Sequence, residues 1–119
     1  MSEQHRPLFW ERSSKKDFKA FPVAVRKDMG VALLVAQSGR TAGSAKPWKG
    51  LGSGVYEPVE DHRGDTFRAV YVVQVTDAVH VLHAFPKKSK SGIATPQPDV
   101  ELVEKRWRAV LARYGLGRG

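Results

Sequence analysis

The sequence predicts an α+β domain with two N-terminal helices, an antiparallel β-sheet of about four strands and a C-terminal helix. Two stretches with helical spacing precede three stretches rich in β-branched and aromatic residues, and an amphipathic stretch ends the chain. The 119 residues contain no internal repeat or linker-like segment. We therefore expect a single domain over residues 1–119 with one modest core.

The N-terminal part is expected to form a short strand followed by two helices. Residues 6–11 (RPLFWE) are rich in apolar and aromatic types and predict the strand. Ser13 and Ser14 can cap the first helix. Pro22 suits the first turn of the second helix, and Gly39 is placed to end it. Apolar residues at helical spacing also predict the second helix, namely Val25, Met29, Ala32, Leu33 and Ala36.

A loop and three strands are predicted in the centre of the chain. Residues 40–54 are rich in Gly, Ser and Pro and are expected to form the loop. The strands are predicted over residues 54–60, 66–75 and 78–85, with residues 76–77 as a tight turn. Pro58 cannot donate to a strand ladder, so it indicates an edge position or a bulge in the first of these strands.

The last helix is predicted to start just after Thr95. This residue can cap the helix, and Pro96 and Pro98 suit its first turn. Gly115 is placed to end it. The residues expected on its apolar face are Val100, Val103, Trp107, Val110, Leu111 and Tyr114.

The charge of the chain favours a polyanionic partner. The net charge is +8 and the lysines are clustered, which favours nucleic acid, the ribosome or an acidic protein over an inert basic surface. The sequence has no run long enough to span a bilayer, no secretory leader and no cysteine. A cytoplasmic protein is therefore expected.

The last predicted hairpin brings an arginine and a histidine together. If residues 76–77 form a two-residue turn, Arg68 lies opposite Phe85. Val70 lies opposite His83 in the same register. Opposed residues share one face of a sheet, so Arg68 and His83 would lie on one face, and a one-residue slip would separate them.

The preceding hairpin decides whether a carboxylate joins this face. If Arg63 and Gly64 form its turn, Val59 lies opposite Arg68 and Glu57 lies on the same face. A longer loop through residues 61–65 would move Glu57 away, and both arrangements are compatible with the sequence.

The residues gathered in this way suit phosphate chemistry. Fixed positive charge stabilises the charge that grows on a phosphate in the transition state, and the arginine fork matches phosphate oxygens. A histidine or a carboxylate can move protons, and RNA supplies its own nucleophile, the 2′-OH. The candidate catalytic residues are Arg68, His83, Lys87, Lys88 and Glu57, and the candidate RNA-binding residues are Lys46, Lys49, Lys90 and Trp48.

Structural roles are alternatives for the same residues. Arg68 can pair with Glu57 or Asp65 across the strands without any catalytic task. His83 fits a satisfied, half-buried histidine, and residues 87–90 fit a solvated loop. Trp48 can stack on a base or fill the core, and the core is the favoured interpretation.

No metal site is expected. His80 and His83 are three residues apart on a strand, so they should face opposite sides of the sheet. His5 and His62 are far from both in the sequence, and no cysteine is available.

Three segments together resemble a known family. They are AKPWKGLGSGVYE, DTFRAVYVVQ and VHVLHAFPKKSKSGIATP, and the likeness extends over nearly the whole chain. The sequence resembles the phage-derived, HigB-like branch of the RelE/ParE toxin superfamily. This resemblance implies the toxin half of a type II toxin–antitoxin pair, with a small helix-turn-helix antitoxin as its partner and no cofactor.

The resemblance also implies an activity. Many RelE-like and HigB-like toxins cut mRNA on the ribosome, where the 2′-OH attacks the adjacent phosphate. The family's arginine on the central strand corresponds to Arg68, and its basic residues correspond to Lys87, Lys88, Lys46 and Lys49. Several superfamily nucleases carry a tyrosine or histidine near the C-terminal end, and here only Tyr114 is available, on the predicted apolar face.

Two other functions are compatible with the same resemblance. One is a ParE-like inhibitor that binds DNA gyrase without cutting nucleic acid, and whose effect would not depend on Arg68. The other is an inactive module that only binds an antitoxin.

Overall fold

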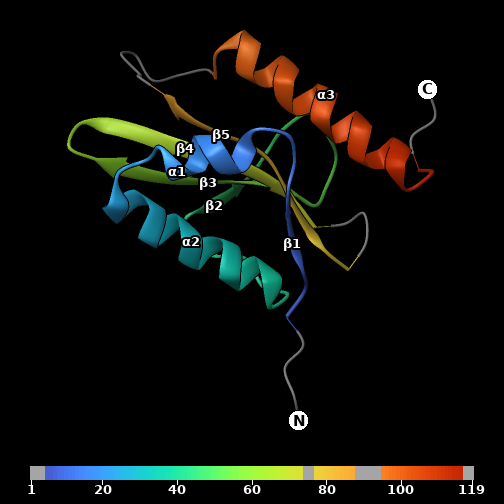
Figure 1. The fold of residues 1–119 in the computed structure, drawn as a ribbon, viewed down its shortest axis with the longest axis horizontal. Coiled ribbons are helices and arrows are strands. Elements are labelled where there is room, and N and C mark those ends of the chain that lie inside the picture. The colour runs from blue at the N-terminus through green and yellow to red at the C-terminus, as the bar shows by residue number, and fades with distance from the viewer. Residues whose placement is uncertain (1–4, 74–76, 88–94, 117–119) are drawn as a thin grey trace.

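Five strands form one mixed sheet in the computed structural model (Figure 1). The structure describes residues 5–73, 77–87 and 95–116, and for Lys87 it describes the backbone only. The strand order across the sheet is β1-β5-β4-β3-β2. The strands are β1 (Leu8–Trp10), β2 (Ala45–Pro47), β3 (Val55–His62), β4 (Asp65–Val72) and β5 (Val79–Lys87). The α+β class expected from the sequence is confirmed.

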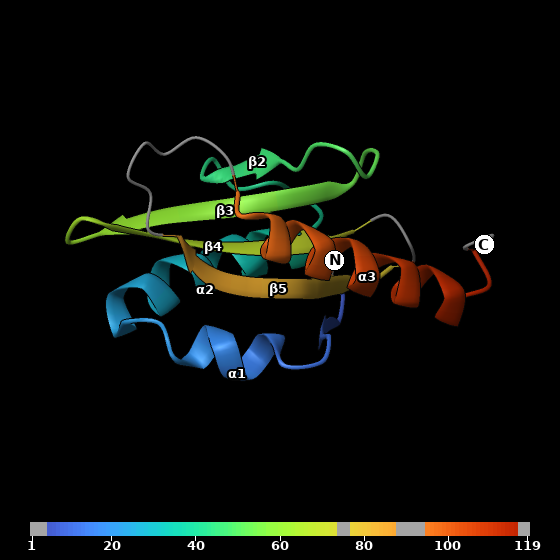
Figure 2. The same cartoon turned by 90° about the horizontal axis from the view of Figure 1, so that it is seen from above.

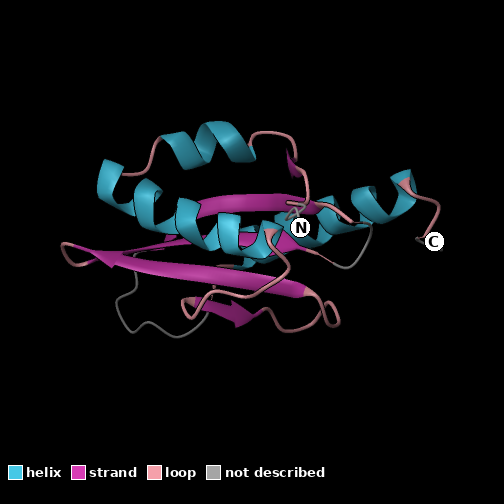
Figure 3. Cartoon of the chain, turned by 90° about the horizontal axis from the view of Figure 1, so that it is seen from below, coloured by secondary structure: helices cyan, strands magenta, loops and turns pink. Residues whose placement is uncertain are grey.

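Helices cover both faces of this sheet. They are α1 (Ser14–Lys19), α2 (Val23–Gln37) and α3 (Gln97–Arg113). Figure 2 shows α3 over one face and α1 alongside β5, and Figure 3 shows α2 lying across the strands. None of the described helices is long and apolar enough to cross a membrane.

The apolar face predicted for α2 is confirmed. All five of its predicted core residues are buried, and Val25 and Met29 pack with Phe67 of β4. Pro22 is the residue just before the helix, and Gly39 follows its C-cap residue with a φ of +92°. The left-handed backbone at this point is why a glycine ends the helix.

Two expectations about the sheet are corrected. The sheet is not wholly antiparallel, because β1 runs parallel to β5. The segment expected to be only a loop contains β2, which pairs with β3. Since β2 continues the sheet beyond β3, Pro58 is not at an edge, and it lies opposite Ala45.

The hairpin between β3 and β4 is the shorter of the two alternatives. Arg63 and Gly64 have φ values of 51° and 87°, as expected for a two-residue turn that joins twisted strands. Val59 therefore lies opposite Arg68, which places Glu57 on the Arg68 face.

The hairpin between β4 and β5 has the predicted register only in the half that lies away from its turn. Arg68 lies opposite Phe85, and Val70 lies opposite His83. Beyond Val70 the register shifts by one residue, so that Tyr71 lies opposite Val81. Residue 75, the last of the predicted strand, lies outside the described residues. Of the turn predicted at residues 76–77, only Asp77 is described.

This bulge overturns the expectation that His80 and His83 face opposite sides of the sheet. Because Leu82 is the extra residue in β5, the alternation of side chains is interrupted between the two histidines. His83 is within hydrogen-bonding distance of Asp99, and His80 contacts Tyr114 at the end of α3. Both histidines therefore face α3. No group of His, Asp or Glu side chains suited to a metal ion occurs within the described parts of the chain.

The core on the α3 side is built as the amphipathic pattern predicts. Val103 and Val110 of α3 pack on Val70, Val72 and Leu82 of the sheet. The expected apolar position of Tyr114 is wrong in part, since this residue is the C-cap of α3 and is 40% exposed. The chain leaves the helix direction after Tyr114, because Gly115 follows with a φ of +71°.

Candidate functional site

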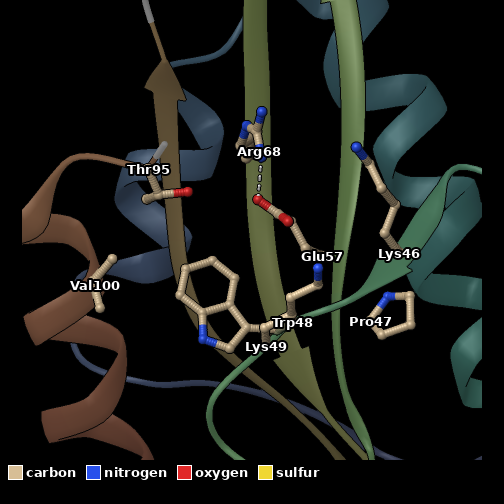
Figure 4. Close-up of a pocket in the computed structure, with 8 residues that line it drawn as sticks. All are labelled: Lys46, Pro47, Trp48, Lys49, Glu57, Arg68, Thr95 and Val100. Atoms are coloured by element: carbon tan, nitrogen blue, oxygen red, sulfur yellow. Dashed lines mark hydrogen bonds and ion pairs between the residues drawn. The ribbon is translucent and has the colours of Figure 1, made fainter. Parts of the chain in front are cut away.

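An open pocket lies on the α3 side of the sheet, where β3 and β4 approach the start of α3. Its volume is about 460 Å³. Side chains from β2, β3, β4 and α3 surround it in Figure 4. The lining residues are Lys46, Pro47, Trp48, Lys49, Glu57, Arg68, Thr95 and Val100. Five of the nine residues proposed from the sequence are among them.

An ion pair between two strands forms the floor of the pocket. Nη1 of Arg68 donates to Oε2 of Glu57 at 2.5 Å, and both side chains are largely buried (Figure 4). The predicted register of β3 and β4 brings them together, since each lies on the face that α3 covers. Nε of Arg68 is buried and has no hydrogen-bond partner within the described parts of the chain. The guanidinium thus retains donor capacity that its carboxylate partner does not use.

Two lysines join the ion pair from the segment around β2. Lys46 lies opposite Glu57 in the β2–β3 ladder, and Lys49 follows two residues beyond the strand. Both line the pocket together with Arg68. Three cations and one carboxylate thus share this open hollow, which is an arrangement suited to a phosphate.

Trp48 anchors the segment that carries the lysines. Its backbone N–H donates to the carbonyl of Val55, and its ring packs with Val55 and Val103 in the core. Only 7% of the residue is exposed, in agreement with the core interpretation. The buried ring anchors the segment between Lys46 and Lys49, and little of its surface is left for stacking on a base.

Thr95 is a lining residue that the sequence analysis did not assign to the site. It was expected to cap α3, but the N-cap residue is Pro96 and Thr95 lies one position earlier. Its hydroxyl points toward the pocket in Figure 4. The Thr-Pro pair is the signal that the sequence offers at this position, and it indicates a helix start and no binding role.

His83 is not brought into this pocket. Its ring stacks on Phe85 at 4.7 Å between centroids, and its Nε2 lies 2.8 Å from Oδ1 of Asp99. It lines a separate hollow with Asp17, Phe21 and other residues. The residue is 5% exposed. The structure therefore separates His83 from Arg68, although they lie on neighbouring strands.

The proposed lysines after β5 are only partly described. The backbone of Lys87 ends β5 opposite Thr66. Lys88 and Lys90 lie outside the described residues.

The burial of His83 predicts a pH effect on stability. Burial lowers the pKa of His83 below its ordinary 6.5, although Asp99 and Asp17 oppose this shift and Arg106 adds to it. As pH falls through 6.5, the unfolded chain takes up a proton that the folded chain does not, so the free energy of unfolding falls. His83→Gln is expected to reduce the loss of stability between pH 7 and pH 5, as measured by urea unfolding. The control is His62→Gln in the β3–β4 hairpin, and an equal loss in His83→Gln and wild type would contradict the assignment.

Fold and pocket together define a small α+β protein with an open pocket, lined by three cations and one carboxylate, on one face of its sheet. A family model described as phage-derived protein Gp49-like (DUF891) matches residues 16–108. The chain belongs to this family, which confirms the phage-derived part of the resemblance stated above. Its place in the HigB-like branch stays a prediction.

Comparison with solved structures gives a match to the RelBE2 toxin–antitoxin complex of Mycobacterium tuberculosis. The match has 13% sequence identity and a TM-score of 0.49, and it covers 74% of this chain and 98% of that chain. Comparison with curated proteins gives no match.

Proposed function

We propose that this protein is the toxin of a type II toxin–antitoxin pair and that it cleaves mRNA on the ribosome. The observation that carries the proposal is the meeting of Arg68, Glu57, Lys46 and Lys49 in one open pocket. An ion pair alone would be explained by sheet packing. Two further cations around a solvent-accessible hollow are not required for packing, and they suit a phosphodiester.

The proposed reaction needs no cofactor. The 2′-OH of the substrate attacks the adjacent phosphorus, the bond to the 5′ oxygen breaks, and a cyclic phosphate and a free 5′-hydroxyl result. Arg68 stabilises the negative charge that grows on the phosphate oxygens. Glu57 takes up the proton of the 2′-OH, and an ammonium group of Lys46 or Lys49 protonates the departing oxygen.

The surface charge supports a polyanionic substrate. The net charge of +8 on 119 residues raises the local concentration of nucleic acid around the protein. The motif resemblance supports a helix-turn-helix antitoxin as the partner that restrains the activity. Ribosome and mRNA are the proposed targets.

Expression of the protein alone gives the direct test. Induction is expected to stop growth and to produce new 5′ ends in a reporter mRNA, mapped by primer extension, with 5′-hydroxyl termini at the cuts. Growth arrest with intact mRNA and an induced DNA-damage response would instead support inhibition of DNA gyrase. Absence of any growth effect at confirmed expression would support an inactive antitoxin-binding module.

A further inference from the structure

A second hollow lies between the turn after β1 and the outer side of α3. Its volume is about 470 Å³. It is lined by Glu11, Arg12, Leu102, Lys105, Arg106, Ala109 and Arg113. Four cations thus surround one carboxylate, and none of these residues lines the Arg68 pocket.

Arg106 is held in this hollow by neutral groups. Its Nη1 donates to the carbonyl oxygen of Leu82 at 2.8 Å, and its Nη2 donates to Oγ of Ser13 at 3.1 Å. Ser13 in turn donates to Asp17, which does not line the hollow. The guanidinium is therefore fixed in place, and three of its five N–H groups make no hydrogen bond within the described residues.

The single carboxylate of the hollow is already occupied. Glu11 accepts hydrogen bonds from Arg113 at 2.6 Å and lies 2.9 Å from Nδ1 of His80. Within the described residues, Arg12, Lys105 and Arg106 form no ion pair. Asp17 and Glu11 attract Arg106 through space without bonding to it. The hollow thus has three cations with no bonded carboxylate, which favours an anion as its ligand.

The lining of the hollow includes two apolar residues. Leu102 and Ala109 lie two helical turns apart on α3, on the same side of the helix as Lys105 and Arg106. No aromatic ring is among the lining residues, although single-stranded RNA is usually held by stacking on such rings. A lining of cations and apolar residues without aromatic rings suits a carboxylate-bearing peptide with an apolar side chain better than it suits a nucleotide.

We propose that this hollow docks an acidic segment of a partner protein. A carboxylate of that segment would accept from the fixed guanidinium of Arg106, a second would meet Lys105 or Arg12, and a neighbouring apolar side chain would rest on Leu102 and Ala109. This surface is distinct from the proposed RNA pocket, so a partner could bind it independently of catalysis.

A short fluorescent peptide of glutamates and two leucines serves as the probe, with binding measured by fluorescence anisotropy at low salt. Arg106→Gln is expected to weaken binding about tenfold, since a hydrogen bond between charged groups is lost. The matched control is Arg26→Gln on α2. Nε of Arg26 also donates to a backbone carbonyl, that of Phe21, but outside the hollow. This control is expected to bind like wild type.

A second variant guards against unfolding of α3. Lys105 is exposed, so Lys105→Glu can reverse a charge in the hollow without disturbing the core, and it is expected to weaken binding as strongly as Arg106→Gln. Unchanged binding in Lys105→Glu, or equal binding of a peptide in which glutamine replaces every glutamate, would overturn the proposal. So would absence of binding to wild type. Tighter binding of oligouridylate, lost in the same variants, would assign the hollow to nucleic acid and also overturn it.

Discussion

Arg68→Gln is expected to lower mRNA cleavage by about 10²–10³-fold, because it removes the cation that stabilises charge on the scissile phosphate. Lys46 and Lys49 remain in the pocket, so the substrate should still bind and the loss should fall mainly on the cleavage step. The measurement is the amount of cut reporter mRNA after addition of purified protein to ribosomes carrying that mRNA.

A stability control is essential for this variant, because Glu57 loses its partner. A carboxylate left without its ion-pair partner in a largely buried position destabilises the fold. The double variant Arg68→Gln with Glu57→Gln places two neutral amides in the same positions and should recover much of that stability while remaining inactive. Arg63→Gln is the control for the lost charge, because it removes one positive charge in the exposed turn between β3 and β4, away from the pocket. Wild-type cleavage by a folded Arg68→Gln variant would remove the basis of the proposed mechanism.

The part of the site that could be predicted from sequence follows from strand register. Arg63-Gly64 between two β-rich stretches fits a two-residue turn, and this turn fixes Glu57 and Arg68 on one face. Given this turn, which the sequence allows alongside a longer loop, the Arg68–Glu57 contact follows from strand alternation. It required no knowledge of packing between distant elements.

The bulge in β5 could not be predicted in the same way. The stretch VHVLHAF contains no glycine or proline that would indicate an extra residue in the strand. The register change comes from packing, since it turns both Leu82 and His83 toward α3. A contact with Asp99 then draws His83 away from the Arg68 pocket, and this contact joins residues that are 16 positions apart.

The strand β2 was missed for a related reason. Its three residues lie in a segment whose Gly, Ser and Pro content is typical of loops. The burial of Trp48 pins this segment against the core, and pairing with β3 follows. The consequence for the site is direct, because β2 places Lys46 opposite Glu57.

Glu11→Gln is expected to lower the free energy of unfolding at pH 7 by about 2–3 kcal/mol, because it breaks a buried, charged network. The Glu11 side chain lies in the turn after β1 and connects two other elements. It meets His80 of β5, which is fully buried, and Arg113 at the end of α3. The Arg113 side chain is half exposed, so its ion pair with Glu11 contributes little to the free energy of unfolding. Most of the lost stability should therefore come from the buried contact with His80.

The pH dependence of this loss separates it from the effect of His83. Burial raises the pKa of Glu11, but hydrogen bonds and charge from Arg113 and His80 outweigh burial and hold it below its ordinary 4.5. A carboxyl with a lowered pKa stabilises the fold fully above 4.5 and loses that contribution as pH falls below it. The difference between wild type and Glu11→Gln should therefore shrink as pH falls below 4.5. Urea unfolding at each pH measures it, with exposed Glu101→Gln on α3 as the control. A difference that is absent at pH 7, or that does not shrink below pH 4.5, would show that Glu11 does not hold α3 to the sheet through its charge.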